Sequence, residues 1–173
     1  MGTKSLAKKI KQVAQLSGSF TLRSGEVSST YFDKYRFESD PQILLEIAQQ
    51  MQPMIPKGTE VLCGMEMGGI PIATMLSQVS GIPAAFIRKE AKTYGTCNYA
   101  EGTELANKKI LIVEDVVSSG GAIIDGVSKM REDGVRVDKA ICVIDRRKSD
   151  ANALGNAGIS LEALFTMADL EDA

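Results

Sequence analysis

The sequence predicts an α/β fold in which a central parallel sheet is flanked by helices, with a small N-terminal helix and hairpin as a hood. Two observations predict this fold. Short apolar runs typical of buried strands alternate with stretches of helical periodicity, and one such run ends in an acidic pair followed by small residues. With 173 residues the chain has the size of a single domain. A chain of this length buries roughly 70% of its unfolded surface without disulfides.

The hood is expected over residues 1–36, ahead of an α/β core over residues 37–173. Apolar residues recur at helical spacing over residues 4–16, with lysines on the other side, so the first element is predicted as an amphipathic helix. Two short β-rich runs over residues 18–33 flank a Ser-Gly turn. This pattern indicates a hairpin.

The core is predicted from the alternation of strands and helices. An Asp-Pro pair at residues 40 and 41 is typical of a helix start, and this helix should end near Gln52 because a proline follows. The other predicted helices cover residues 70–79 and 122–133. The predicted strands cover residues 61–63, 84–87, 110–113, 140–144 and 161–165.

The stretch from Ile110 to Ala122 is expected to organise the site. A buried strand leads into Glu114 and Asp115, and then the run Ser-Ser-Gly-Gly opens a helix. Ligands of open parallel sheets bind beyond the carboxyl ends of strands, and the free N–H groups of a helix N-terminus favour an anion. Small residues let such N–H groups approach phosphate oxygens. The two acids would repel a phosphate, so they are expected to face a sugar diol, or Mg²⁺ through water.

Two further loops are expected at the same edge of the sheet. The glycine-rich loop over residues 64–71 indicates either a second phosphate cradle or tight strand-to-helix packing, and the sequence leaves both open. A long polar loop over residues 88–102 begins with the cations Arg88, Lys89 and Lys92. Such clusters are usually solvated, but this one leaves a strand end that faces the expected phosphate site. We therefore interpret the loop as an anion-binding lid.

Composition excludes several classes of function. The chain has no histidine, which excludes histidine triads, histidine bases and histidine metal ligands. Its 3 cysteines show no Cys-x-x-Cys spacing, so neither a disulfide framework nor a zinc site is indicated. With 20 basic and 22 acidic residues the net charge is -2, so no nucleic-acid partner is expected. No apolar stretch suits a signal peptide or a membrane span, which predicts a cytoplasmic protein without a membrane partner.

The strand, acidic pair and Ser-Ser-Gly-Gly run form neither a Walker loop nor a dinucleotide-binding turn. They resemble the signature with which type I phosphoribosyltransferases bind phosphoribosyl diphosphate (PRPP). The hairpin spacing Phe-Thr-Leu-x-Ser-Gly, then Ser-x-x-Tyr-x-Asp, is similar to that of the orotate branch of this family. The match runs from about Phe20 to Arg146 and implies the type I phosphoribosyltransferase fold.

The resemblance implies an enzyme that transfers the ribose 5-phosphate group of PRPP to orotate in pyrimidine nucleotide biosynthesis, giving orotidine 5′-monophosphate and pyrophosphate. It implies Mg²⁺ as cofactor without a direct protein ligand, held through PRPP and water near Glu114 and Asp115. It also implies a homodimer that shares loop residues across the interface. The residues implied as catalytic are Lys92, Glu114 and Asp115. Those implied to bind PRPP are Arg88, Lys89, Lys92, Glu114, Asp115, Val116, Val117, Ser118, Ser119, Gly120, Gly121 and Ala122. Those implied to contact orotate are Ser118, Arg146 and Arg23.

Two departures from the family limit what the resemblance carries over. Gly68 stands where much of the family has a lysine, so a diphosphate contact is either missing or supplied by backbone. Tyr94 stands where many members have a loop histidine, and the sequence does not show whether it replaces that histidine.

Three alternatives stay open. For Arg146, the alternative to an orotate contact is an ion pair with neighbouring Asp145 or with glutamate residues. The protein as a whole has two: a type I phosphoribosyltransferase for another base, or a PRPP-binding regulator without catalysis.

Overall fold

The computed structural model describes residues 2–22, 24–90, 99–148 and 152–173. Its strands are β1 (Gln15–Thr21), β2 (Val27–Phe32), β3 (Val61–Met65), β4 (Ala84–Ile87), β5 (Ala100–Gly102), β6 (Ile110–Val117), β7 (Lys139–Asp145) and β8 (Ser160–Thr166). Its helices are α1 (Thr3–Ala14), α2 (Tyr35–Glu38), α3 (Pro41–Met51), α4 (Gly69–Ser80), α5 (Gly121–Glu132), α6 (Ala153–Asn156) and α7 (Met167–Glu171), and a 3₁₀ turn, η1 (Gln52–Met54), follows α3. The central sheet has the strand order β5-β4-β3-β6-β7-β8, and β1 and β2 form a separate hairpin.

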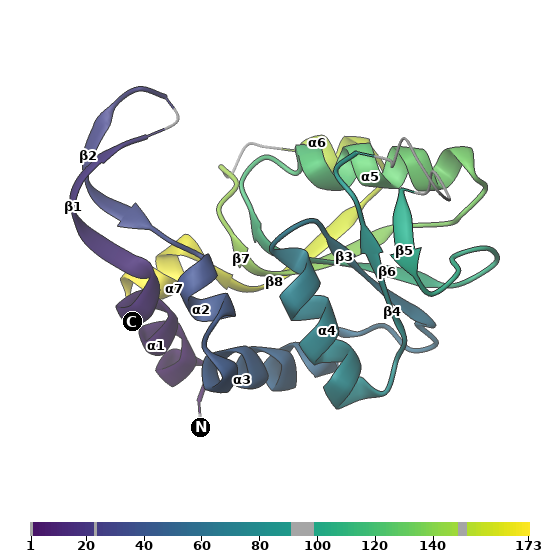
Figure 1. The fold of residues 1–173 in the computed structure, drawn as a ribbon, viewed down its shortest axis with the longest axis horizontal. Coiled ribbons are helices and arrows are strands. Elements are labelled where there is room, and N and C mark those ends of the chain that lie inside the picture. Colours follow the sequence, from purple (N-terminus) through teal and green to yellow (C-terminus); the bar gives the residue numbers. More distant parts are fainter. Residues whose placement is uncertain (1, 23, 91–98, 149–151) are drawn as a thin grey trace.

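Strand β6 lies in the middle of the sheet and pairs in parallel with both β3 and β7. Alternate side chains of a strand point to opposite faces, so an all-apolar strand can serve two cores. Leu111 and Val113 enter the core that α1, α3 and α4 complete, whereas Ile110 and Ile112 enter the core that α5 and α6 complete. Figure 1 shows these helices on the two sides of the sheet.

Helix α3 begins where the Asp-Pro pair predicts. The side chain of Asp40 accepts hydrogen bonds from the N–H groups of Gln42 and Ile43 at 2.9 and 3.0 Å, and Pro41 is the first helical residue. The neighbouring α4 ends at Gly81, whose φ of 74° lies in the left-handed region that favours glycine. Local sequence chemistry therefore sets the start of α3 and the end of α4.

The hood elements differ in how they meet the core. Helix α1 packs against α2, α3 and α7, and its Leu6 and Ile10 are fully buried in the first core. The hairpin of β1 and β2 instead extends away from the sheet, with most of its residues exposed (Figure 1). Helix α2 connects this hairpin to α3 and lies against both α1 and α3.

Three features differ from the sequence prediction. Strand β6 continues through Val117, because its second half also pairs with β7, so Glu114 and Asp115 lie inside the strand. Strand β5 runs antiparallel to β4 within the segment predicted as a loop. The sequence predicts none of α2, α6 and α7, because helices of 4 or 5 residues are too short to show helical periodicity.

Within the described ranges no helix is long and apolar enough to span a membrane.

Candidate active site

The carboxyl ends of β3, β4, β6 and β7 meet at one edge of the sheet because these strands are parallel. At this edge β6 carries Glu114 and Asp115, which are only 8% and 0% exposed. Burying a carboxylate is costly unless hydrogen bonds or an opposite charge compensate it. The surroundings of this acidic pair therefore define the site.

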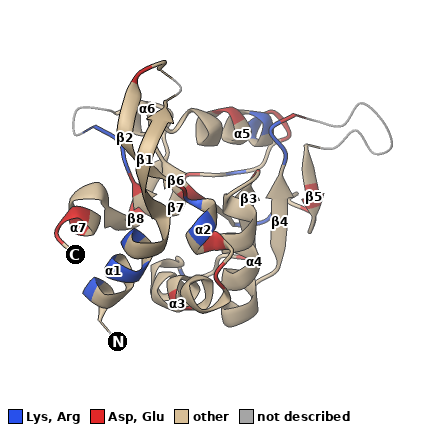
Figure 2. Cartoon of the chain, turned by 60° about the vertical axis from the view of Figure 1, so that its left-hand side comes forward, with Lys and Arg blue, Asp and Glu red and all other residues tan. Residues whose placement is uncertain are grey.

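Lys34, which directly precedes α2, supplies the opposite charge. Its Nζ lies 2.6 Å from Oδ2 of Asp115. Burial opposes ionisation of Asp115, but hydrogen bonds with Glu114 and Glu38 and the ion pair with Lys34 hold its pKa below the ordinary value. Figure 2 shows α2 in front of the ends of β6 and β7, where it brings a basic and an acidic segment to the site.

Glu114 and Glu38 behave in the opposite way. Burial raises the pKa of each carboxyl group, and hydrogen bonding to Asp115 and its negative charge raise both further. These opposite shifts favour a carboxylate on Asp115 and protonated carboxyl groups on Glu38 and Glu114. Lys34 balances the single negative charge.

The loop between β3 and α4 packs directly against this cluster. A Cβ atom on Gly68 would collide with Oδ2 of Asp115, and one on Gly69 would collide with the carbonyl oxygen of Val113. No side chain fits at either position, so a lysine cannot occupy position 68 without displacing Asp115. Tight strand-to-helix packing thus explains the two glycines.

The Ser-Ser-Gly-Gly run forms the turn from β6 into α5. Gly120 has a φ of 83°, and a Cβ there would lie 2.7 Å from Cγ of Leu154, so this position needs glycine for both conformation and space. Ser118 and Ser119 are exposed. Helix α5 has 12 residues and no acidic residue in its first turn, so its N-terminus offers N–H groups and a positive dipole end to an anion.

Arg88 and Lys89 follow the end of β4. The N–H of Lys89 donates to Oε2 of Glu66 at 2.9 Å, and its carbonyl accepts from Nζ of Lys129 at 3.1 Å. These bonds hold residue 89 between the β3–α4 loop and α5 while its side chain stays exposed. The guanidinium of Arg88 lies 4.0 Å from Oε1 of Glu101 on β5, so it is engaged at the base of the predicted lid.

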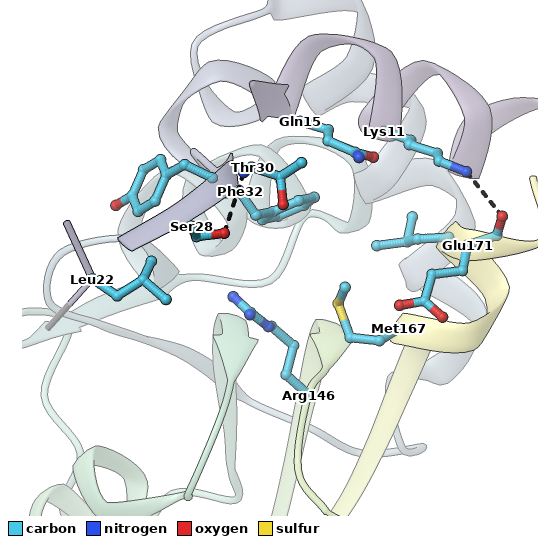
Figure 3. A pocket seen from close by; sticks show the side chains of 11 residues that line it. Lys11, Gln15, Leu22, Ser28, Thr30, Phe32, Arg146, Met167 and Glu171 are labelled. Carbon is cyan, nitrogen blue, oxygen red and sulfur yellow. Dashed lines mark hydrogen bonds between the residues drawn. The ribbon is translucent and has the colours of Figure 1, made fainter. Parts of the chain in front are cut away.

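Arg146 directly follows β7 and points into a pocket of about 380 Å³ below the hairpin (Figure 3). Its guanidinium carbon lies 5.9 Å from the centre of the Phe32 ring. Asp145 instead forms an ion pair with Arg147, whose Nε donates to Oδ1 at 3.0 Å and whose Nη2 donates to Oδ2 at 2.8 Å. Arg146 is exposed and, within the described part of the chain, forms no ion pair.

The walls of this pocket come from the hood and from α7. Leu22 and Ser28 belong to the hairpin side, and Met167 lies on the opposite side of Arg146 (Figure 3). Lys11 donates to the carbonyl of Glu171 at 2.9 Å, which ties α1 to α7 at the pocket rim. Apolar walls, hydroxyl groups and the guanidinium of Arg146 suit a flat polar ring that carries an anionic group.

The structure thus gathers the acidic pair, the turn over residues 116–122, Lys89 and Arg146 at one edge of the sheet. Arg23, Lys92 and Tyr94 lie outside the described residues. Sequence reasoning misses three residues that the geometry adds, which are Lys34, Glu38 and Phe32. A signal for two of them exists, because Phe32 lies within the Ser-x-x-Tyr-x-Asp motif and Lys34 directly follows it.

Comparison with known proteins gives one consistent result. Residues 40–157 match the phosphoribosyl transferase domain. An orotate phosphoribosyltransferase of Nocardioides sp. is 45% identical over 97% of this chain and 94% of the relative. One from Methanocella arvoryzae is 37% identical over 95% of each chain. The crystal structure of Mycobacterium tuberculosis orotate phosphoribosyltransferase in complex with Fe(III) dicitrate is similar with a TM-score of 0.87 at 27% identity, covering 97% of this chain and 98% of that one.

Proposed function

This chain belongs to the phosphoribosyl transferase family, in its orotate branch, and from that premise we propose how its site transfers ribose 5-phosphate from PRPP to orotate. The products are orotidine 5′-monophosphate and pyrophosphate. One observation supports adjacent binding places for the two substrates. The backbone N–H of Arg146 donates a hydrogen bond to the carbonyl of Val117 at 2.8 Å. The candidate orotate ligand and the candidate PRPP turn are therefore hydrogen-bonded neighbours.

The end of β6 and the start of α5 suit the phosphosugar. The N–H groups at the N-terminus of α5 are proposed to bind the 5-phosphate, with the hydroxyls of Ser118 and Ser119 as further donors. The ionised Asp115 accepts a hydrogen bond from one ribose hydroxyl, and the protonated Glu114 donates to the other. One acceptor and one donor on adjacent residues complement a vicinal diol.

The diphosphate is proposed to lie toward the end of β4. Glycosyl transfer passes through an oxocarbenium-like state, in which negative charge builds on the departing pyrophosphate. The exposed side chain of Lys89 can stabilise that charge, and Arg88 can do so after leaving Glu101. The part proposed for Lys92 depends on the resemblance, because Lys92 lies outside the described residues.

Arg146 is proposed to bind the carboxylate of orotate, because a guanidinium can grip a carboxylate with two parallel hydrogen bonds. The ring of Phe32, already beside the guanidinium, provides a flat apolar surface for the pyrimidine. Ser118 directly follows Val117, and its exposed hydroxyl is proposed to contact the base.

We propose that Mg²⁺ binds here through substrate and water. Within the described residues no group of three or more cysteine, aspartate and glutamate side chains could hold a metal ion. Mg²⁺ commonly keeps several waters and takes its remaining ligands from one or two carboxylates and substrate phosphates. Glu114 and Asp115 would then contact its water shell, and the ion would neutralise charge on the leaving diphosphate.

A steady-state assay with PRPP, Mg²⁺ and one base at a time tests the proposed function. Orotate should turn over, whereas uracil, adenine and guanine should not, because they lack the carboxylate that Arg146 binds. Turnover of a purine or of uracil without orotate would assign the enzyme to another base. PRPP binding without turnover of any base would indicate a regulator.

We also propose a homodimer in which Lys92 acts on the partner's site. This proposal rests on the resemblance to the family, in which loop residues are shared across the dimer interface. The variants Lys92→Ala and Asp115→Asn should each lose most of the activity when assayed alone. Mixed and allowed to exchange subunits in equal amounts, they should recover about one quarter of wild-type activity, because about half of the dimers are mixed and each has one intact site. Demonstrated exchange without recovered activity would contradict the shared site.

A further inference from the structure

Lys34 is the residue of the site whose role neither the sequence motifs nor the family assignment explains. It lies at the junction between the hairpin and α2, and its Nζ reaches across to Oδ2 of Asp115 at 2.6 Å. The side chain of Asp115 is 0% exposed, whereas that of Lys34 is 31% exposed. The ion pair therefore joins a fully buried carboxylate to a partly exposed ammonium.

Asp115 is surrounded by further acidic groups, and the ion pair with Lys34 brings a positive charge to them. Two more carboxyl groups, on Glu38 and Glu114, are buried beside it. Within the described residues, one buried oxygen of each group has no hydrogen-bond partner. Gly68 contributes no side chain to the cluster, because a Cβ there would collide with Oδ2 of Asp115. Among the described residues, Lys34 is the cation that forms an ion pair within this cluster.

The position of the charge in the cluster depends on Lys34. Three adjacent carboxyl groups share a site too small for three negative charges, so protons distribute among them. Hydrogen bonds from Glu114 and Glu38, together with the ammonium 2.6 Å away, favour Asp115 as the member that stays ionised. Nζ of Lys34 also lies 5.2 Å from the centre of the Tyr35 ring, and the charge of Asp33 acts on Glu38. Neither residue provides a positive charge that could replace Lys34. Without Lys34 the negative charge could move to Glu38 or Glu114, and the carboxyl of Asp115 could turn.

We propose that Lys34 is a positioning residue of the PRPP site, which holds the carboxylate of Asp115 charged and oriented toward the ribose diol. The inference rests on the proposed function. It adds that the hood takes part in sugar binding, because Lys34 comes from the hood and Asp115 from the core sheet. The diol is thus bound correctly only when the hood is docked on the core.

Three variants separate this role from a purely structural one. Lys34→Met removes the charge, and Lys34→Arg restores it on a longer side chain. Lys9→Met is the matched control, because Lys9 also joins the hood to the core, through an ion pair of 2.7 Å with Glu46, away from the site. Calorimetry with PRPP and Mg²⁺ measures sugar binding directly, and steady-state kinetics give the KM for each substrate.

Lys34→Met should weaken PRPP binding about tenfold, as expected for the loss of a charge-assisted contact, and should raise the KM for PRPP to match. The KM for orotate should change less than twofold, and Lys34→Arg should recover most of the PRPP affinity. Lys9→Met should leave both substrates unaffected. Unchanged PRPP binding in Lys34→Met, or an equal loss in Lys9→Met, would overturn the inference. If the wild type binds PRPP but does not turn over orotate, the proposed function fails while the calorimetry still decides the role of Lys34.

Discussion

The two halves of the site are built in different ways. The PRPP half, at the end of β6, consists of Glu114 and Asp115 within a strand that is paired on both sides. The orotate half is a pocket whose cation, Arg146, is exposed and whose walls come from the hairpin and from α7. Buried strand residues fix the first half, and side chains on peripheral elements assemble the second.

This difference shows where the site can change. Any substitution near Asp115 must satisfy a buried cluster of charges and the close approach of Gly68. A substitution around Arg146 meets mostly exposed elements, so the base pocket can be reshaped with little cost to folding. A common phosphosugar half with a variable base half is what this architecture permits. Three substitutions test the comparison, and they are ordered by expected effect.

The largest effect is expected from Asp115→Asn. The substitution removes the charge that holds the ribose diol and leaves Lys34 without its partner, so PRPP use should fall about 100-fold, corresponding to about 3 kcal/mol. The KM for orotate should change little. Asp125→Asn is the control, because Asp125 is exposed on the neighbouring α5. Kinetics with each substrate varied in turn measure the effect, and an equal loss for both substrates would show that the halves are not separate.

Arg146→Ala should have the complementary effect. Losing a charge-assisted pair to the carboxylate costs about 2 kcal/mol, so the specificity constant for orotate should fall about 30-fold while PRPP binding by calorimetry stays unchanged. Lys148→Ala is the matched control, since Lys148 is an exposed cation two positions further on. An unchanged orotate dependence would remove Arg146 from the site.

The smallest effect is expected on stability, from Glu38→Gln. Burial raises the pKa of Glu38 to about 9, so folding takes up a proton that the unfolded chain loses above about pH 4.5. The free energy of unfolding should therefore fall as the pH rises from 5 toward 9. Glutamine keeps a hydrogen-bond donor but does not titrate. Between pH 5 and pH 8 the free energy of unfolding of the variant should therefore rise by about 1 kcal/mol or more relative to that of the wild type.

Urea unfolding at both pH values measures this gain, and Glu132→Gln, an exposed site on α5, should show none. If wild type and Glu38→Gln depend on pH in the same way, Glu38 does not hold a proton in the folded protein.

Much of the fold could be predicted from the sequence because its signals are local. Four apolar residues before Glu114, the Asp-Pro pair and the Ser-Ser-Gly-Gly run each act through neighbours in the chain. Lys34 and Glu38 could not be assigned in this way, because they meet Asp115 only after the hood has docked on the sheet. The short helix α2 that carries Glu38 to the site shows no periodicity of its own. The role of Gly68 depends likewise on a contact between separate strand ends.

A crystal structure with orotidine 5′-monophosphate bound would test the central claim most directly, because one ligand occupies both halves. We expect the 5′-phosphate at the N-terminus of α5, the ribose hydroxyls on Glu114 and Asp115, and the base carboxylate on the guanidinium of Arg146. A phosphate bound away from α5 would contradict this claim. So would a base carboxylate that does not contact Arg146, with the guanidinium still beside Phe32.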